Sequence, residues 1–258
     1  MPLPTPLRAQ GCAVFLLVAL AAAAAPGQTA TNRTFAARAE TNFFQAQKLL
    51  ATQPGDAAAA WQLGRASFDW AEFATNETQR AALAQTGIAA CRQALAREPK
   101  SAPAHYYLAM NFGQLAEAEA PSIAAYKLVK EIEREFKAAD ELDEKLDFAG
   151  PPRCLGLLYR DAPGWPISIG SKRKAREFLE RAAALAPDFP ENQLNLAESH
   201  LRWHQPGEAE KALKKLDALW PAAQTNLVGE GWEQSWDEWR TRRTAVQAEL
   251  QKIYKHAP

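Results

Sequence analysis

The sequence predicts an all-α protein built from antiparallel helical hairpins that stack side by side. Alanine supplies much of a hydrophobic content of 47%, which is typical of closely packed helices. Pairs of one large and one small apolar residue recur along the chain, and a second helical segment follows each pair. A proline follows most of these second segments, and proline cannot continue a helix.

The pattern is clearest in the stretch 152–190. Its first segment carries Leu155, Gly156 and Tyr159 at helical spacing. Its second segment carries small and large apolar residues before a proline, namely Ala175, Leu179, Ala182 and Pro187. Because glycine and alanine let neighbouring helices approach closely, this stretch is predicted to form a hairpin in which the helix around Ala175 packs on Gly156.

Three further pairs match Leu155–Gly156, namely Leu63–Gly64, Leu108–Ala109 and Leu196–Ala197. They predict units near 56–100, 101–150, 151–189 and 190–221. The repeat resembles the tetratricopeptide repeat (TPR), which carries leucine, glycine and tyrosine on its first helix and alanines before a proline on its second. The resemblance implies a TPR-like right-handed superhelix of about four antiparallel hairpins, forming a single domain over residues 28–258.

The units differ in length. In unit four, Ala197 and Ala209 are 12 residues apart, whereas the matching interval is 23 residues from Gly64 to Gly87 and from Ala109 to Ile132. The extra residues amount to about three helical turns, which keeps the buried face in phase. The first two hairpins are therefore predicted to be tall. Unit three contains an Ala-Pro-Gly-Trp-Pro insert instead, which predicts a loop.

An extra helix is predicted at each end of the array. Apolar residues recur at helical spacing between Phe35 and Leu50, which predicts an N-terminal helix. A helix over 231–255 is predicted to cap the last unit with Trp232, Trp236 and Trp239, since an end unit otherwise exposes a core face. An exposed docking role for these tryptophans is the alternative. The opposite side of this helix carries Arg240, Arg242, Arg243 and Glu249.

The N-terminus resembles an export signal. Arg8 precedes the apolar run Cys12–Ala25, which is short for a membrane span. Residues 1–27 are therefore predicted to be a signal peptide that is cleaved after Gly27, with Ala30 as the second choice of cleavage site. Cleavage would leave a periplasmic or secreted protein with no membrane span. An uncleaved N-terminal anchor is the alternative.

Charge indicates which partners are improbable, and cysteine positions indicate the expected state of the thiols. Thirty basic and thirty acidic residues leave no net charge, which argues against a nucleic-acid partner. Cys91 and Cys154 fall in units one and three, so we expect two buried free thiols, with a disulfide as the alternative.

The loop Ala162–Ser171 is the first candidate binding site. Two prolines stiffen it, and Trp165, Ile167 and Ile169 are apolar at alternate positions. These side chains either fold back onto hairpin three and become buried, or form a ligand lid or docking edge.

The positive charges after this loop are a second candidate. Ser171 can cap the next helix, but Lys172, Arg173 and Lys174 oppose the helix dipole in its first turn. Two arrangements could offset this repulsion. The three residues could pair with the acidic run Asp140, Glu141, Asp143 and Glu144, or they could hold an anion at the helix N-terminus.

Other candidate residues lie on first helices. Tyr106 and Phe112 serve the core or face a groove, and His105 is expected to be structural. His200 and His204 stand four residues apart on a predicted helix, a spacing that can hold zinc, but a third ligand is not evident. The sequence contains no recognisable nucleophile with its base, so no catalytic residue, metal or cofactor is predicted.

A second resemblance concerns the T component associated with TRAP-type transporters. The segments AHYYLAMNFGQLA, GPPRCLGLLY and KAREFLERAAALAP are similar to that periplasmic, TPR-like family. Two functions follow as hypotheses. One is a non-enzymatic scaffold of the cell envelope that binds a protein or peptide in its concave groove. The other is a protein that handles a small apolar or carboxylated ligand in a cavity closed by the Trp165 loop.

Overall fold

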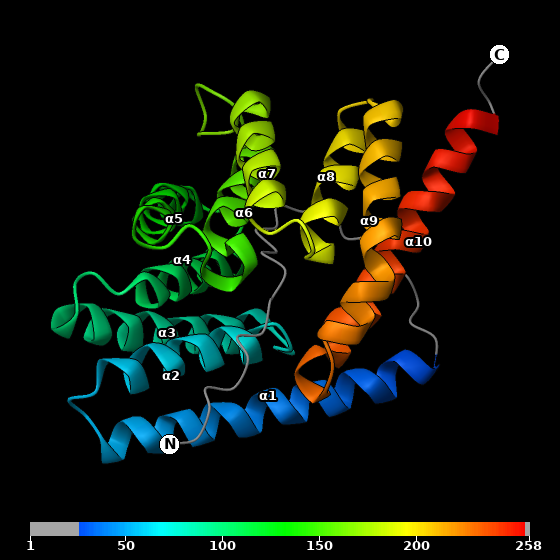
Figure 1. Cartoon of the computed structure of the whole chain (residues 1–258). Coiled ribbons are helices and arrows are strands. Elements are labelled where there is room, and N and C mark those ends of the chain that lie inside the picture. Colours follow the sequence, from blue (N-terminus) through cyan, green and yellow to red (C-terminus); the bar gives the residue numbers. More distant parts are fainter. Residues whose placement is uncertain (1–25, 256–258) are drawn as a thin grey trace. The chain divides into compact units, whose positions relative to one another are not determined.

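The computed structural model describes residues 26–255, and within them it contains helices and loops but no β-strand longer than an isolated bridge (Figure 1). The predicted all-α class is confirmed. The helices are α1 (Pro26–Thr52), α2 (Ala57–Ala71), α3 (Glu77–Arg97), α4 (Ala102–Ala118), α5 (Ile123–Leu142), α6 (Leu146–Asp161), α7 (Lys172–Leu185), α8 (Pro190–Arg202), α9 (Pro206–Asn226) and α10 (Glu233–Lys255), with a short 3-10 helix at Glu230–Trp232.

The described residues form two compact units. The N-terminal unit comprises 26–143 together with Asp161–Gly170, and the C-terminal unit comprises Glu144–Arg160 with 171–255. Each unit contains two of the predicted hairpins, α2/α3 and α4/α5 in the first, and α6/α7 and α8/α9 in the second. The single domain expected over 28–258 stays a prediction.

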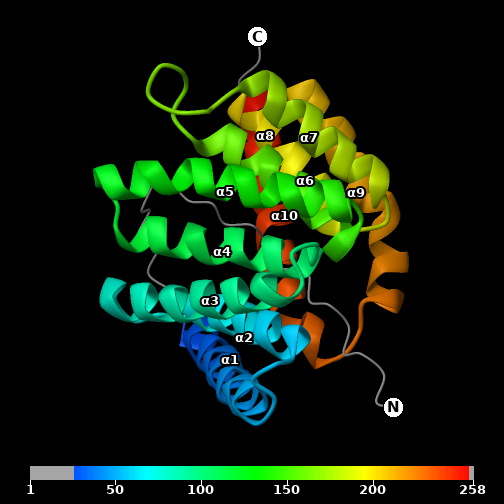
Figure 2. The same cartoon turned by 90° about the vertical axis from the view of Figure 1, so that its left-hand side faces the viewer.

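In the N-terminal unit, α1 to α5 stack in chain order, so that each helix packs on the one before it (Figure 2). Glycines set the closest approaches. A Cβ on Gly64 would lie 2.2 Å from Cys91 Sγ, and a Cβ on Gly87 would lie 2.1 Å from Asn111 Oδ1. The small residues that mark the repeat therefore let α3 approach α2 on one side and α4 on the other.

Helix lengths in this unit follow from the sequence. Helices α3 and α5 span 21 and 20 residues, whereas α7 in the third hairpin spans 14. The first and second hairpins are thus taller than the third, as predicted, although α9 of the fourth hairpin also spans 21 residues. Side chains cap the starts of these helices, because Asp56 accepts a hydrogen bond from Ala58 N, and Asn76 and Ser122 accept from Gln79 N and Ala125 N.

The C-terminal unit begins with an unusual turn. Asp147, Phe148 and Ala149 have φ values of 51°, 55° and 63°, so the right-handed part of α6 begins after them, near the start predicted at Pro151. Farther along α6, Gly156 meets α7, where an added Cβ would lie 2.6 Å from Leu179 Cγ. The predicted close approach at Gly156 is confirmed, and the residue opposite it is Leu179 rather than Ala175.

One predicted boundary was wrong. Unit four was expected to end at Pro221, but Pro221 lies inside α9, which continues to Asn226. A proline removes only one backbone donor from a helix, and packing of the residues that follow can outweigh that loss. Ala223, two residues after the proline, is buried.

The final helix caps the C-terminal unit as predicted. Helix α10 packs on α8 and α9, and Trp232, Trp236 and Trp239 are 4%, 9% and 1% exposed. The indole Nε1 of Trp236 donates a hydrogen bond to Leu227 O at 2.7 Å. The three tryptophans therefore belong to the core, and the alternative of an exposed docking face is excluded.

Candidate functional site

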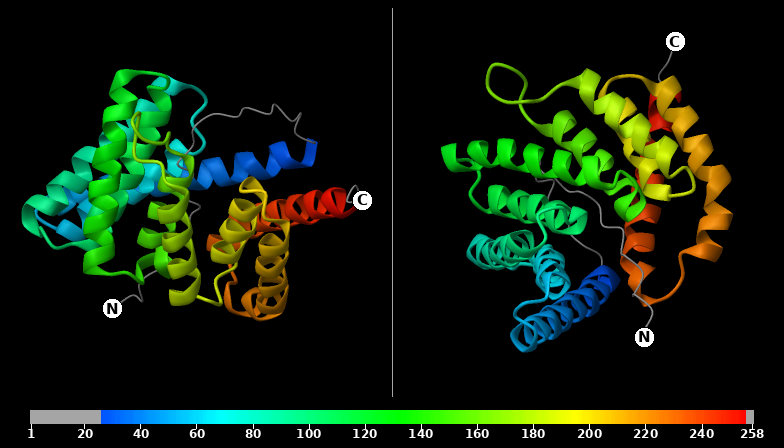
Figure 3. Two further views of the ribbon diagram at one scale, coloured as in Figure 1. Left: turned by 90° about the horizontal axis from the view of Figure 1, so that it is seen from above. Right: turned by 60° about the vertical axis from the view of Figure 1, so that its left-hand side comes forward.

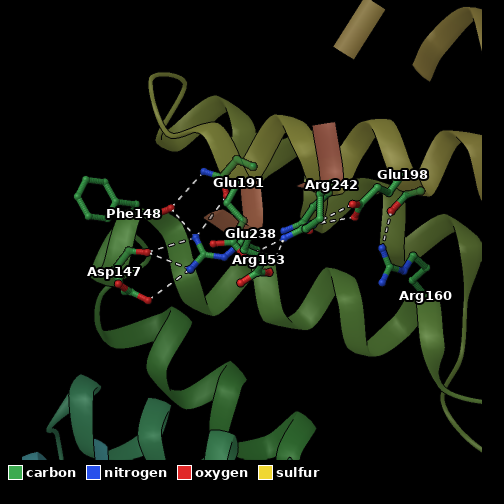
Figure 4. A network of polar contacts seen from close by, with 11 residues as sticks. Asp147, Phe148, Arg153, Arg160, Glu191, Glu198, Glu238 and Arg242 are labelled. Atoms are coloured by element: carbon green, nitrogen blue, oxygen red, sulfur yellow. Dashed lines mark hydrogen bonds and ion pairs between the residues drawn. The ribbon is translucent and has the colours of Figure 1, made fainter. Parts of the chain in front are cut away.

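A polar side of α8 holds α10 in the C-terminal unit. We call it the α8 polar face, and it consists of Glu191, Asn195 and Glu198. Arg242 of α10 donates to both carboxylate oxygens of Glu198 at 2.8 Å and to Asn195 Oδ1 at 2.5 Å (Figure 4). Its guanidinium also lies 3.7 Å from the carboxylate of Glu191, which is 1% exposed. One arginine of α10 is thus bound by two carboxylates and an amide of α8.

Charge explains why this contact is tight. Burial alone would lower the pKa of Arg242, but Glu198, Glu191 and Glu238 outweigh that effect and raise it above its ordinary value. Burial raises the pKa of Glu238 despite the guanidinium beside it. Arg242 is therefore a permanent cation among acidic groups, and a bidentate pair of this kind fixes both distance and orientation.

Two arginines of α6 extend the polar contacts to the third hairpin. Arg160 donates to Ser199 Oγ of α8 at 3.2 Å (Figure 4). Arg153, which is 0% exposed, forms an ion pair with the Asp147 carboxylate at 3.3 Å and donates to the carbonyl oxygen of Phe148 at 3.0 Å. It also donates to Asn192 Oδ1 of α8 at 3.3 Å.

Arg153 and Asn192 account for the left-handed turn before α6. Such backbone conformations are unfavourable for residues other than glycine and persist only where the surroundings hold them. Here the carbonyl of Phe148 accepts from both Arg153 and the Asn192 amide, the latter at 3.1 Å. The same amide also donates to Ala182 O and Ala186 O at the end of α7. The turn, α7 and α8 are therefore held together by two buried polar side chains.

The sequence pattern does not indicate this network, and the position that it predicts for one member is wrong. Arg242 was expected on the outer side of the last helix with Arg240 and Arg243, but its side chain is only 20% exposed. Arg240 is indeed exposed, at 55%. Periodicity assigns a helix face, but the face that meets a partner depends on which neighbouring helix carries the matching carboxylates.

The N-terminal unit has a corresponding first-helix surface, which we call the α2 face, made by Trp61, Gln62 and Arg65. Gln62 is exposed, and the other two are half-buried. The Trp61 ring stacks on Tyr107 of α4 with centroids 5.9 Å apart. Arg65 Nε lies 3.9 Å from Asp69 Oδ2, one turn farther along α2.

The predicted loop presents its apolar residues to solvent. Trp165 and Ile167 are 89% and 72% exposed, and Ile169 is half-buried. The alternative in which these side chains fold back and become buried is therefore excluded for Trp165 and Ile167. The role of the three residues in binding stays a prediction.

The cations that follow the loop have partners outside the acidic run 140–144, and the alternative of a bound anion stays a prediction. Ser171 caps α7 as predicted, because its hydroxyl accepts from Lys174 N at 3.3 Å. Arg173 pairs with Glu177 on its own helix, Lys172 lies over the Trp203 ring, and Lys174 lies over the Tyr159 ring. The acidic residue Glu144 pairs instead with Arg181. Aromatic rings and an in-helix carboxylate thus stabilise these charges.

Three other candidate residues on α4 have contacts within the protein. Tyr106 and Phe112 are 1% and 4% exposed, so both rings belong to the core around α4. The two ring nitrogens of His105 lie 2.6 Å from Glu135 Oε2 and 3.1 Å from Pro99 O. These contacts agree with the structural role expected for this residue.

The predicted histidine pair does not share a helix. Helix α8 ends at Arg202, and His204 has a φ of 57° beyond that end. His200 Nδ1 lies 3.1 Å from Gln205 Oε1. Among residues 26–255 there is no group of three side chains suited to a metal ion.

Cys91 is a free and fully buried thiol, as expected, and burial raises its pKa well above the usual range of a thiol. Cys154 is also fully buried. The free state expected for Cys154 stays a prediction.

Known proteins resemble this chain in fold. The TPR protein TTC0263 of Thermus thermophilus has 18% identity and a TM-score of 0.61, covering 86% of this chain and 96% of its own. The MamA structure has 18% identity and a TM-score of 0.50, covering 71% of this chain and 89% of its own. The chain is therefore a TPR-like helical repeat protein.

A family described as "Regulator of microtubule dynamics protein 1-3" matches residues 30–146. That range nearly coincides with the main segment of the N-terminal unit, 26–143. None of the curated proteins matches the chain. In the described part of the chain, every helix is too short or too polar to cross a bilayer.

Proposed function

We propose that the chain is a protein-interaction scaffold that holds a helical segment of a partner protein against a first helix of its hairpins. The observation that carries this proposal is the binding of Arg242, in which the α8 polar face holds another helix through one charged side chain. The TPR-like fold supports it, since parallel first helices form an extended surface for such segments.

The α2 face is the surface that we propose for the external partner. Gln62 and Arg65 stand one residue before and two residues after Leu63, just as Asn195 and Glu198 stand around Leu196. In the C-terminal unit these positions already hold α10. At the matching positions α2 offers an amide and a cation, with Trp61 beside them as an apolar contact.

The charge of Arg65 determines the charge that we expect on the partner helix. Where α8 offers the carboxylate of Glu198 to an arginine, α2 offers the guanidinium of Arg65, so the complementary helix carries an aspartate or glutamate. Arginine binds a carboxylate through two parallel hydrogen bonds, which gives geometric selectivity as well as attraction.

A charge-reversal experiment tests the proposal. Helical peptides are selected from a display library on the full chain, and their affinities are measured by calorimetry. We expect acidic peptides to be selected, Arg65→Gln to weaken them about tenfold, and Arg65→Glu to select basic peptides instead. Arg173→Glu, a charge reversal at an 80% exposed arginine, is the matched control. Equal losses in the two charge-reversal variants, or unchanged selection with Arg65→Glu, would contradict the proposal.

We also propose that the chain is exported to the periplasm or secreted. This proposal is supported by Arg8 and the apolar run Cys12–Ala25, which lie outside the described residues. Mass spectrometry of the protein from its own cells should find an N-terminus at Gln28. A retained Met1 end would contradict cleavage.

A further inference from the structure

Exposed apolar residues lie on two segments of the N-terminal unit. Trp165 and Ile167 of the loop are 89% and 72% exposed, and Ile123 and Tyr126 of α5 are 78% and 41% exposed. In Figure 2 and in both panels of Figure 3, this loop lies beside the N-terminal half of α5. We call these four residues the Trp165 patch. Aromatic and β-branched side chains exposed together commonly mark a contact surface.

The backbone holds the loop in a defined shape. Gly170 N donates to Pro163 O at 2.9 Å, and Ile167 N donates to Gly164 O at 3.0 Å. A Cβ on Gly170 would lie only 2.0 Å from Ala162 O, so the closed base of the loop requires glycine. The side chains between these two ends are therefore displayed by a closed loop, which lowers the ordering cost of a contact.

Two lysines beside the patch carry positive charge. Lys127 and Lys130 are exposed on the N-terminal half of α5, whereas the acidic residue of that half, Glu131, pairs with Arg134 at 2.6 Å. The loop residues 162–170 carry no charge at all. A partner surface that complements the patch therefore has anionic groups at its surface and an apolar layer beneath them. It must also admit a projecting loop.

We infer that the Trp165 patch docks the protein on an anionic lipid surface. Tryptophan and tyrosine favour the headgroup level of a bilayer, isoleucine enters the acyl boundary, and lysines bind anionic headgroups. The patch contains these residue types on a helix end and an adjoining loop. This inference goes beyond the scaffold proposed above, because it assigns a lipid contact to a surface separate from the α2 face.

Quenching of one tryptophan by lipid tests the inference in the full chain. Fluorescence is measured with vesicles of brominated phosphatidylcholine containing about one-third phosphatidylserine, and the Trp165→Phe spectrum is subtracted to isolate Trp165. We expect bromine to quench this component strongly. The component isolated with Trp70→Phe, a half-buried tryptophan of α2, should stay unquenched. The readout reports insertion at residue 165 itself, whatever attaches the rest of the chain.

The lysines provide the second part of the test. Lys127→Gln combined with Lys130→Gln should raise the lipid concentration needed for quenching about tenfold. The matched control combines Lys48→Gln with Lys215→Gln, two exposed lysines on α1 and α9, and should leave it unchanged. The inference is overturned if Trp165 is not quenched, or if quenching is equal without phosphatidylserine. Binding of acidic peptides at the α2 face would be unaffected, so the two proposals can fail separately.

Discussion

The two units carry the same repeat pattern but hold their helices together differently. In the N-terminal unit, small residues and a neutral amide make the closest contacts, as at Gly64 and Asn111, whose amide donates to Gly64 O at 2.8 Å. In the C-terminal unit, arginines link α6, α8 and α10, namely the buried Arg153 and the partly exposed Arg242. One helical pattern therefore accommodates either steric or charged contacts between helices.

The capping helix explains the difference. Helix α10 covers the α8 polar face, and a carboxylate that loses contact with water is costly unless a cation replaces the water. Arg242 supplies that cation to Glu198 and Glu191. Gln62 on α2 remains exposed instead and needs no such partner.

The largest effect is expected from overpacking at Gly156. Gly156→Leu places atoms where a Cβ alone would lie 2.6 Å from Leu179 Cγ, so α6 and α7 must separate. We expect a loss of about 3 kcal/mol or more in the free energy of unfolding, measured with urea. Gly113, in α4 of the other unit, has no atom within 4 Å of an added Cβ, and Gly113→Ala should gain about 0.5–1 kcal/mol. A Gly156→Leu variant as stable as wild type would refute the helix register.

The next effect concerns the charged contacts of the C-terminal unit. Arg242→Ala leaves Glu191 and Glu198 without their cation and should cost about 3 kcal/mol. Arg240→Ala, two residues earlier and exposed, should cost less than about 0.5 kcal/mol. Denaturant unfolding of both variants checks the difference. Equal losses would mean that the tryptophans alone hold α10.

A smaller effect is expected from pH in the N-terminal unit. The hydrogen bond to Glu135 raises the pKa of His105. Burial raises the pKa of Glu135, but hydrogen bonds from His105 and Arg134 outweigh it and lower the pKa. Because the folded-state pKa of His105 exceeds its unfolded value, its stabilisation is complete below about pH 6.5 and is lost as the pH rises through the folded value.

The wild-type Tm should therefore fall by on the order of 1–3 °C between about pH 6 and pH 8, relative to a His105→Gln variant measured in parallel. The carboxylate contributes in the opposite direction, and its stabilisation is lost only in acid below its ordinary pKa. A Tm difference that stays constant with pH would show that His105 is neutral in the folded protein.

The smallest effect on stability is expected at the loop. Trp165→Ala removes a side chain that is 89% exposed, so the free energy of unfolding should change by less than about 0.5 kcal/mol. Thermal unfolding monitored by circular dichroism checks this. A loss above about 1 kcal/mol would show that the indole is part of the core in solution.

Part of the candidate site was visible in the sequence. Proline and glycine in a short insert predict the loop, and Trp165, Ile167 and Ile169 are its candidate binding residues. The sequence does not determine whether the Trp165 indole is buried or exposed, because alternation places side chains on one side of the loop without showing what packs against that side. The Arg242 contacts were missed because Glu198 is 44 residues away along the chain.

The sequence by itself determined the helices, the hairpins and the points of closest approach, because apolar spacing and small residues act locally along a helix. It also determined the cap, whose tryptophans recur at helical spacing. Only the tertiary structure decided which polar residues became buried, that Pro221 lies inside a helix, and where each cation found its partner. Those outcomes depend on contacts between residues far apart in the chain, where the gain from pairing offsets the loss of water.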